Sequence, residues 1–193
     1  MELFEELSNK YHYYDECSRN IHYYNGWKTN KSWIINKKVI IPLRSYSDIF
    51  NRYNPASRDI VNKLEDMEKC FNYLDNGRTE SVDLEQSLKF AEEYGETKDI
   101  VLKYFTVTFY KKGTCHITFT NEELLKKFNI FGSQHKGWLP PGYGKKTYKD
   151  MSTEEKAVVN DFEGEAEYSK VMRNTTYYLF DGNNLNLLED KTA

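Results

Sequence analysis

The sequence predicts an α+β fold, in which helices pack on an antiparallel sheet. Two observations support this prediction. Between residues 57 and 94, apolar residues recur every three or four positions, which is the period of helices with one buried face. Between residues 100 and 120, apolar and polar residues alternate on both sides of a short turn, which is typical of a β-hairpin. We therefore expect a central hairpin at about 100–120, an antiparallel helix pair at about 57–94, and C-terminal helices packed on the sheet.

The helix pair opens with a long helix that begins at Ser57. Its apolar residues follow at steps of four, three, four and three, namely Ile60, Leu64, Met67, Phe71 and Leu74. The Asn76-Gly77 pair ends it, because both residues tolerate a left-handed backbone. A second helix is predicted from about Asp83 to Tyr94, with Gly95 just after its last turn.

The hairpin contains one strand from Ile100 to Tyr110, in which Val101 and Phe105 share a face with Val107, Phe109 and Lys103. The turn is Lys111-Lys112-Gly113, and the second strand runs from Thr114 to Thr120. Alternation of Cys115, Ile117 and Phe119 predicts that one face of this strand is buried.

The N-terminal third predicts smaller elements. Residues 2–16 are predicted to form a peripheral amphipathic helix, and Asn25-Gly26 is a hairpin turn signal. Two β-branched runs, Ile34–Ile35 and Val39–Ile41, predict a strand, a turn and a second strand. Pro42 ends the second strand or places it at a sheet edge.

After the hairpin, Thr120-Asn121-Glu122-Glu123 is a capping box that starts a short helix to about Phe128. Residues 129–149 are rich in glycine and proline but also in aromatic residues, which predicts an ordered loop that presents lysines outward. Ser152 opens another capped helix, which Gly164 interrupts. The run Thr175 to Phe180 is predicted as a last strand, and the tail at 181–193 as peripheral.

The length and composition favour one domain over residues 1–193. Hydrophobic residues make up 39% and aromatic residues 16%, which is too many for low-complexity disorder. No apolar run is long enough to cross a membrane, and the acidic start lacks a signal-peptide core. The three cysteines are odd in number and far apart. We therefore expect a cytoplasmic protein that has no contact with a membrane.

The net charge of −3 hides an uneven distribution. The windows Cys17–Ser47 and Leu124–Lys149 each contain six Lys or Arg and no Asp or Glu, so the remainder of the chain carries −15. All three tryptophans, Trp27, Trp33 and Trp138, lie in these two windows. Basic side chains neutralise phosphates and aromatic rings stack on bases, so the pattern favours nucleic-acid contact. Clustering by chance, with the tryptophans in the core, is the alternative interpretation.

The predicted nucleic-acid-binding residues are the lysines of both windows with one histidine and two aromatic residues beside them: Lys28, Lys31, Lys37, Lys38, Lys126, Lys127, His135, Lys136, Trp138, Tyr143, Lys145, Lys146 and Lys149. If the two windows form one interface, they should lie near each other in space. The backbone amides of Gly142 to Lys146 are a weaker candidate for a phosphate cradle.

Enzymatic motifs are absent from the sequence. It contains no P-loop, no GxSxG, no HExxH and no methyltransferase signature. The histidines and cysteines lack metal-ligand spacing. Glu154-Glu155-Lys156 after Asp150 resembles a nuclease carboxylate–lysine arrangement, but helix capping explains these residues better. We expect no catalytic residue, no metal and no cofactor.

Four segments carry a family resemblance: NGWKTNKSWIINKKVIIPL (25–43), DMEKCFNYLDNGRTESVDL (66–84), residues 102–146 with the block GWLPPGYGKK, and DMSTEEKAVVNDFEGEAEYSKVM (150–172). Over about residues 20–180 the chain resembles a bacterial and phage domain of unknown function. That domain often follows DNA methyltransferase or helicase modules in proteins of conjugative elements and phages. The resemblance implies a context of mobile DNA and no catalytic residue.

Three functions remain open. The first is a non-catalytic DNA-binding protein of a phage or mobile element, free-standing or beside a methyltransferase or helicase partner. The second is a counter-defence protein that inhibits a Cas or restriction nuclease, for which the acidic helices are the relevant feature. The third is a cryptic nuclease-like enzyme. DNA is the expected ligand, as duplex or single strand, and a homodimer is compatible with the small size of the basic windows.

Overall fold

The computed structural model describes residues 34–47, 52–80 and 83–179. The chain forms two compact units, residues 1–125 and residues 126–193. The predicted helix at 2–16, the Asn25-Gly26 turn and the tail at 181–193 lie outside the described residues. The single domain stays a prediction, because a domain is defined by its capacity to fold alone.

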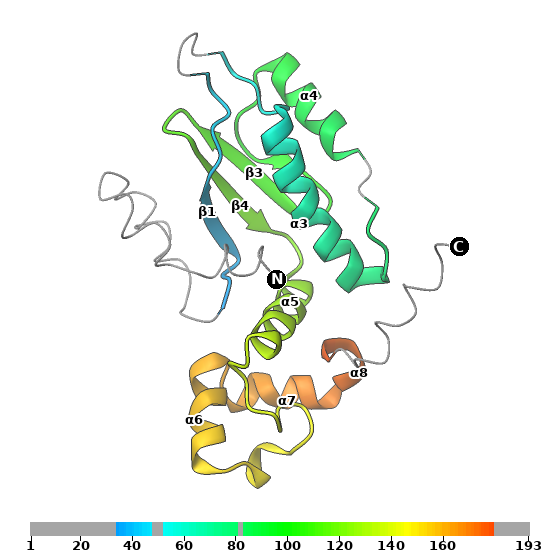
Figure 1. Cartoon of the computed structure of the whole chain (residues 1–193), viewed down its shortest axis with the longest axis vertical. Coiled ribbons are helices and arrows are strands. Elements are labelled where there is room, and N and C mark those ends of the chain that lie inside the picture. The colour runs from blue at the N-terminus through cyan, green and yellow to red at the C-terminus, as the bar shows by residue number, and fades with distance from the viewer. Residues whose placement is uncertain (1–33, 48–51, 81–82, 180–193) are drawn as a thin grey trace. The chain divides into compact units, whose positions relative to one another are not determined.

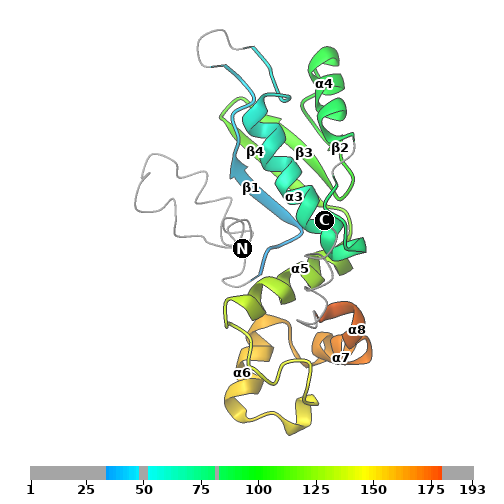
Figure 2. The same cartoon turned by 45° about the vertical axis from the view of Figure 1, so that its right-hand side comes forward.

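The described residues of the first unit contain a four-stranded antiparallel sheet with the strand order β1-β4-β3-β2 (Figures 1 and 2). Its register places Ile117 of β4 opposite both Val39 and Val107, so that buried residues of three strands share one face. This arrangement confirms the α+β class and the central hairpin. The strands are β1 (Lys38–Pro42), β2 (Ile100–Val101), β3 (Phe105–Tyr110) and β4 (Thr114–Phe119).

Strand β1 is the second of the two predicted β-branched runs, and within the described ranges the first run, Ile34–Ile35, forms no strand of the sheet. Pro42 is the last residue of β1, and β1 lies at the edge of the sheet, as predicted. An edge position suits proline because it cannot donate a hydrogen bond to a neighbouring strand.

The run from residue 100 to residue 110 forms two strands, where one was predicted. Strand β2 folds back along β3, with Ile100 opposite Val107. In one continuous strand, Lys103 would point to the same side as Phe105 and Val107, both of which are fully buried. Burying an unpaired ammonium group is costly, and the chain reversal leaves Lys103 exposed.

Helices α3 (Arg58–Asn76) and α4 (Leu84–Tyr94) confirm the predicted pair and run in opposite directions (Figures 1 and 2). Each helix ends at a glycine with a left-handed backbone, since Gly77 has φ 73° and Gly95 has φ 67°. The amide of each glycine donates to a carbonyl of the last turn, which satisfies groups that a helix end leaves unpaired.

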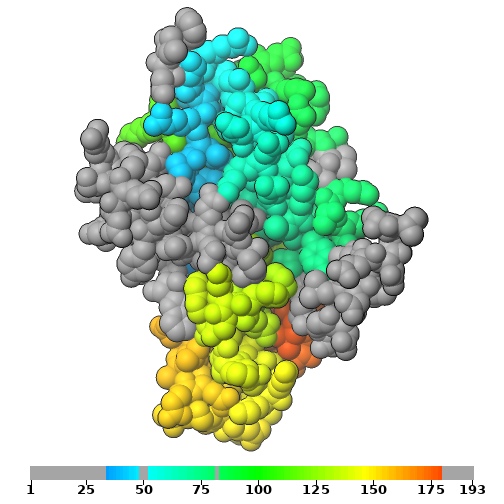
Figure 3. Space-filling view, viewed as in Figure 1, coloured from blue at the N-terminus to red at the C-terminus, as the bar shows by residue number. Residues whose placement is uncertain are grey.

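The core of the first unit lies between α3 and the sheet. The ring of Phe71 on α3 stacks on Phe119 of β4, with centroids 5.0 Å apart and planes 13° from parallel. Leu64 and Met67 on the same helix face are fully buried. In the space-filling view, α3 forms much of the visible surface of the first unit (Figure 3). Burial of each such side chain stabilises the fold by about 1.5–3 kcal/mol.

Helix α5 (Glu122–His135) is longer than predicted and has a different cap. The amide of Leu124 donates to Asn121 Oδ1 at 3.0 Å. The Thr120 hydroxyl instead donates to the carbonyl of Tyr104 at 2.9 Å, so Thr120 does not form the predicted capping box. The helix continues past Phe128 because Ile130 and Ser133, which the sequence placed in a loop, are buried.

In its described residues, up to Leu179, the second unit contains the 3-10 helix η1 (Tyr148–Asp150) and three further helices (Figure 1). The Ser152 capping box is confirmed, with reciprocal bonds between Ser152 and Glu155. Gly164, at φ 82°, interrupts the helices as predicted. The prediction of a strand from Thr175 to Phe180 is wrong, because Thr175–Tyr178 forms a short helix. The helices are α6 (Thr153–Phe162), α7 (Glu165–Arg173) and α8 (Thr175–Tyr178).

No helix within the described ranges is both long and apolar enough to cross a bilayer. The same ranges contain no group of three or more His, Cys, Asp or Glu side chains arranged to hold a metal ion.

Candidate nucleic-acid interface

The basic loop of the second unit, residues 136–149, is held in place by Tyr168. The Tyr168 hydroxyl accepts a hydrogen bond from the Gly144 amide at 3.0 Å and donates one to the carbonyl of Lys146 at 2.6 Å. The ring of Tyr143 lies edge-on to that of Tyr168, with centroids 5.0 Å apart. The prediction of an ordered loop pinned by aromatic residues is therefore confirmed for residues 136–147, whereas residues 129–135 of the predicted loop belong to α5.

Tyr143 anchors this loop from inside. It is 1% exposed, and its hydroxyl donates to Glu163 Oε1. Burial, and then the neighbouring Glu163 carboxylate, raise the pKa of Tyr143 well above its usual value. A ring so enclosed has no face open to a nucleobase, so the structure does not support Tyr143 as a stacking residue.

The predicted phosphate cradle is wrong. A cradle needs several backbone amides that point at the ligand. Here the amides of Tyr143 and Gly144 donate to Pro140 O and Tyr168 Oη, at 2.8 and 3.0 Å. Those of Lys145 and Lys146 donate to Gly142 O at 3.0 and 3.1 Å. The turn thus uses these four amides to hold its own shape.

Several of the predicted lysines in the second unit are engaged internally. Lys126 is only 16% exposed and lies between two carboxylates, 3.0 Å from Glu163 Oε2 and 2.9 Å from Glu167 Oε2. Lys146 forms an ion pair with Glu155 at 3.0 Å. The ammonium group of Lys127 lies over the ring of Tyr177, 4.7 Å from its centroid. These contacts weaken the case for phosphate binding by the three lysines.

Exposed positive charge remains at Lys145 and Lys149, which have no ion-pair partner among the described residues. His135 is exposed at the end of α5, and its ring lies 4.4 Å from that of Phe131. Lys136 and Trp138 are half-buried.

The first basic window is described only in part, because Lys28 and Lys31 lie outside the described residues. Lys37 forms an ion pair with Glu122 at 2.6 Å, and Lys38 is exposed at the start of β1. The two windows fall in different compact units, and the predicted proximity of their lysines stays a prediction.

A basic cluster that the sequence interpretation missed lies at the hairpin end of the sheet. The turn Lys111-Lys112-Gly113 joins β3 to β4, and both lysines are exposed. The register places Pro42 opposite Thr114, which brings the segment after β1 to the same end. The Arg44 side chain crosses Gly113 so closely that a Cβ on this glycine would lie 2.9 Å from Arg44 Cγ.

Aromatic rings accompany these charges. Lys111 Nζ lies 5.8 Å from the centroid of the Tyr46 ring. Tyr110, 38% exposed, lies against His116 with ring centroids 4.3 Å apart. Burial, and then the charge of Lys38, lower the pKa of His116 below 6.5, so that its imidazole is neutral at pH 7. We name Arg44, Tyr46, Tyr110, Lys111 and Lys112 the hairpin-end cluster.

The sequence contained two partial signals for this cluster. Lys111 and Lys112 were identified as turn residues, and Arg44 lay in the first basic window. Their proximity depends on β1 pairing with β4, two strands that are far apart in the sequence. The distribution of charge along the sequence does not predict which strands pair.

Comparison with protein families places most of the chain in a known family. The model described as "Domain of unknown function (DUF4942)" matches residues 1–138. The matched range includes the hairpin-end cluster and ends before Leu139 of the basic loop. Neither the curated proteins nor the solved structures contain a match to this chain.

Proposed function

The chain belongs to the family Domain of unknown function (DUF4942), and within it we propose that this protein is a non-catalytic DNA-associated protein. The observation that supports the proposal best is the hairpin-end cluster, where Arg44, Lys111 and Lys112 lie beside exposed Tyr110. Cationic side chains next to an exposed ring are the chemistry that binds a phosphate backbone and stacks on a base.

DNA is favoured over other polyanions by two considerations. A ligand made of phosphates alone would make no stacking contact with the Tyr110 ring, whereas a nucleobase has a π-face that can stack on it. The resemblance to a domain found beside DNA methyltransferase and helicase modules supports DNA as the nucleic acid and a phage or mobile element as the source. The basic loop offers a second contact through Lys145 and Lys149, which are exposed on a rigid support.

The test is binding of labelled duplex and single-stranded DNA to the full chain, followed by fluorescence anisotropy between about 50 and 200 mM salt. The logarithm of affinity falls by about 0.9 per phosphate contact on duplex DNA and about 0.7 on single strands, for each tenfold rise in salt. The double variant Lys111→Ala/Lys112→Ala should weaken binding and reduce the duplex slope by about 2.

A matched control carries the same charge change elsewhere. Lys89→Ala/Lys98→Ala removes two exposed lysines, one on α4 and one just after it, and should leave the salt slope unchanged. Tyr110→Ala should weaken single-strand binding more than duplex binding, because bases are accessible only in the single strand. Absence of DNA affinity at low salt would rule out the proposal, as would equal losses in the test and control variants.

The basic loop is tested separately with Lys145→Ala/Lys149→Ala. These two lysines are chosen because Lys146 already pairs with Glu155. A loss that adds to that of the hairpin-end variant would indicate two contact regions on one DNA molecule. An unchanged affinity would restrict the interface to the first unit.

A further inference from the structure

A second surface of the first unit has the opposite character to the hairpin-end cluster. Phe90 and Tyr94 on α4 are 51% and 63% exposed, and Val101 on β2 is 71% exposed. The two rings lie against each other with centroids 4.4 Å apart. A shallow groove between α4 and β2 is lined by Phe90 and Val101, and Figure 2 shows β2 beside α4. Exposed apolar side chains that gather around a groove indicate a binding surface.

Strand β2 also offers backbone hydrogen-bonding groups. It is the edge strand of the sheet, opposite to β1. The amide of Leu102 donates to Phe105 O at 3.0 Å, so that Leu102 is in a hydrogen-bonded pair with β3. Hydrogen-bonded and non-hydrogen-bonded pairs alternate in antiparallel sheets. Val101, opposite Thr106, therefore directs its N–H and C=O away from β3, where an added strand can pair with them.

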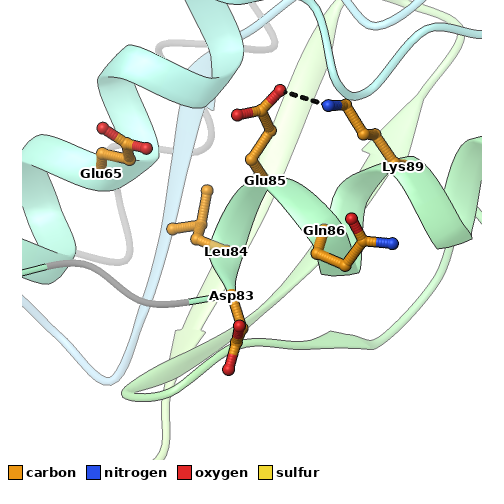
Figure 4. Close-up of a pocket in the computed structure, with 6 residues that line it drawn as sticks. All are labelled: Glu65, Asp83, Leu84, Glu85, Gln86 and Lys89. Carbon is orange, nitrogen blue, oxygen red and sulfur yellow. Dashed lines mark ion pairs between the residues drawn. The ribbon is translucent and has the colours of Figure 1, made fainter.

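The rim of the groove is acidic. Asp83, Glu96 and Asp99 line it, and residues 83–101 carry a net charge of −4. The acidic surface continues to a second depression at the start of α4. Glu65 of α3 lines this second depression (Figure 4). There Lys89 pairs with Glu85 at 2.7 Å, while Asp83 points away from that pair. Such a rim repels phosphate and attracts Lys and Arg.

We propose that the groove between α4 and β2 is the docking site for an extended basic segment of another protein, which adds to the sheet as a strand beside β2. The occupant's backbone pairs with Val101, its apolar side chains cover Phe90 and Val101, and its Lys or Arg side chains face the acidic rim. A second copy of this chain fits poorly, because two equally acidic rims would oppose each other. This site goes beyond the DNA contact proposed above and does not depend on it.

The probe is a labelled peptide of about eight residues that alternates Val and Lys, with a peptide that alternates Val and Glu as its counterpart. Binding to the full chain is measured by fluorescence anisotropy. We expect the Val–Lys peptide to bind, its affinity to fall with added salt, and the Val–Glu peptide not to bind. In nuclear magnetic resonance spectra, the Val101 amide should shift on binding.

The decisive variant is Val101→Pro. It removes the outward amide but no bond to β3, and an edge strand tolerates proline. We expect at least a threefold loss of peptide affinity, about what one hydrogen bond contributes. Val101→Thr keeps the amide and the β-branched shape, and should bind like the wild type. Glu96→Gln/Asp99→Asn should also weaken binding, while Asp161→Asn, an exposed acid on α6, should not.

Three results would overturn the proposal. The first is that Val101→Pro and Val101→Thr bind the Val–Lys peptide with equal affinity. The second is that the Val–Lys peptide does not bind at low salt. The third is that the wild type self-associates in sedimentation experiments and Val101→Pro abolishes this association. If Val101→Pro lowers the unfolding midpoint, the rim variant decides, since neutralising Glu96 and Asp99 leaves the strand pairing intact. Loss of peptide binding with unchanged DNA binding separates this site from the hairpin-end cluster.

Discussion

Gly144 donates its backbone amide to the hydroxyl of Tyr168 at 3.0 Å, and the same hydroxyl donates to the carbonyl of Lys146 at 2.6 Å. One phenol thus satisfies both sides of the turn that presents Lys145. Tyr168 is itself buried against Tyr143, so that the loop is fixed from the interior of the second unit.

Removal of that hydroxyl should destabilise the second unit. Tyr168→Phe leaves an amide and a carbonyl without their partner, which costs about 1–3 kcal/mol for a buried group. The matched control is Tyr148→Phe, whose hydroxyl donates to Asn160 Oδ1 at 2.9 Å on the surface. That change should cost under about 0.5 kcal/mol. Urea denaturation measures both, and equal costs would contradict the anchoring role of Tyr168.

Gly144 should tolerate no side chain. Its φ is 75°, and a Cβ would lie 2.2 Å from Leu179 Cδ1. Gly137→Ala is the control, because Gly137 has φ 66° and a Cβ there would meet nothing within 4 Å. Both changes carry the strain of a left-handed alanine, but only Gly144→Ala adds overpacking, typically about 1–3 kcal/mol. A free energy of unfolding that falls equally in both variants would refute the close approach.

The ion pair between Lys126 and Glu163 should be costly to break from one side. Lys126 is 16% exposed and Glu163 is 7% exposed, and burial raises the pKa of Glu163. Lys126→Met strands a carboxylate, for which we expect a loss of about 3–5 kcal/mol at pH 7. Adding Glu163→Gln should recover part of it. The exposed pair Lys89–Glu85 should show a coupling of about 0.3–0.5 kcal/mol in the same double-mutant cycle.

Stability should depend on pH through His116. Its pKa in the folded protein lies below the ordinary value of 6.5, first because of burial and then because of Lys38. As pH falls below about 6.5, His116 becomes protonated in the unfolded chain before it does so in the folded protein. The free energy of unfolding therefore decreases. His116→Gln should remove this contribution. Denaturation curves of the two proteins at several pH values between about 5 and 8 measure it, and parallel pH profiles would contradict it.

Local patterns predicted the elements whose formation depends on nearby residues. Helix α3 was predicted from the spacing of the apolar residues between Ile60 and Leu74, and the ends of α3 and α4 from Gly77 and Gly95. The Ser152 capping box was predicted from four consecutive residues, and both of its hydrogen bonds are present. These features need only the helical period and the hydrogen-bonding needs of a helix end.

Tertiary packing overrode local preference elsewhere. The run at 175–178 is rich in threonine and tyrosine, residues that favour strands, yet it forms α8 with Tyr178 buried and the ring of Tyr178 5.4 Å from Lys126 Nζ. Thr120 was expected to cap α5, but its hydroxyl donates to the carbonyl of Tyr104, which lies across from it just before β3.

By itself, the sequence determined the α+β class, the helix pair, the hairpin and the division of the chain into basic and acidic stretches. Only the tertiary structure decided which of those charges reach solvent. Lys126 and Lys145 lie in the same basic window, yet the first is enclosed by Glu163 and Glu167 and the second is exposed. A charge is counted along the chain, but its availability depends on which carboxylates folding brings within a few ångströms, and β-strand pairing likewise placed Arg44 beside the Lys111-Lys112 turn.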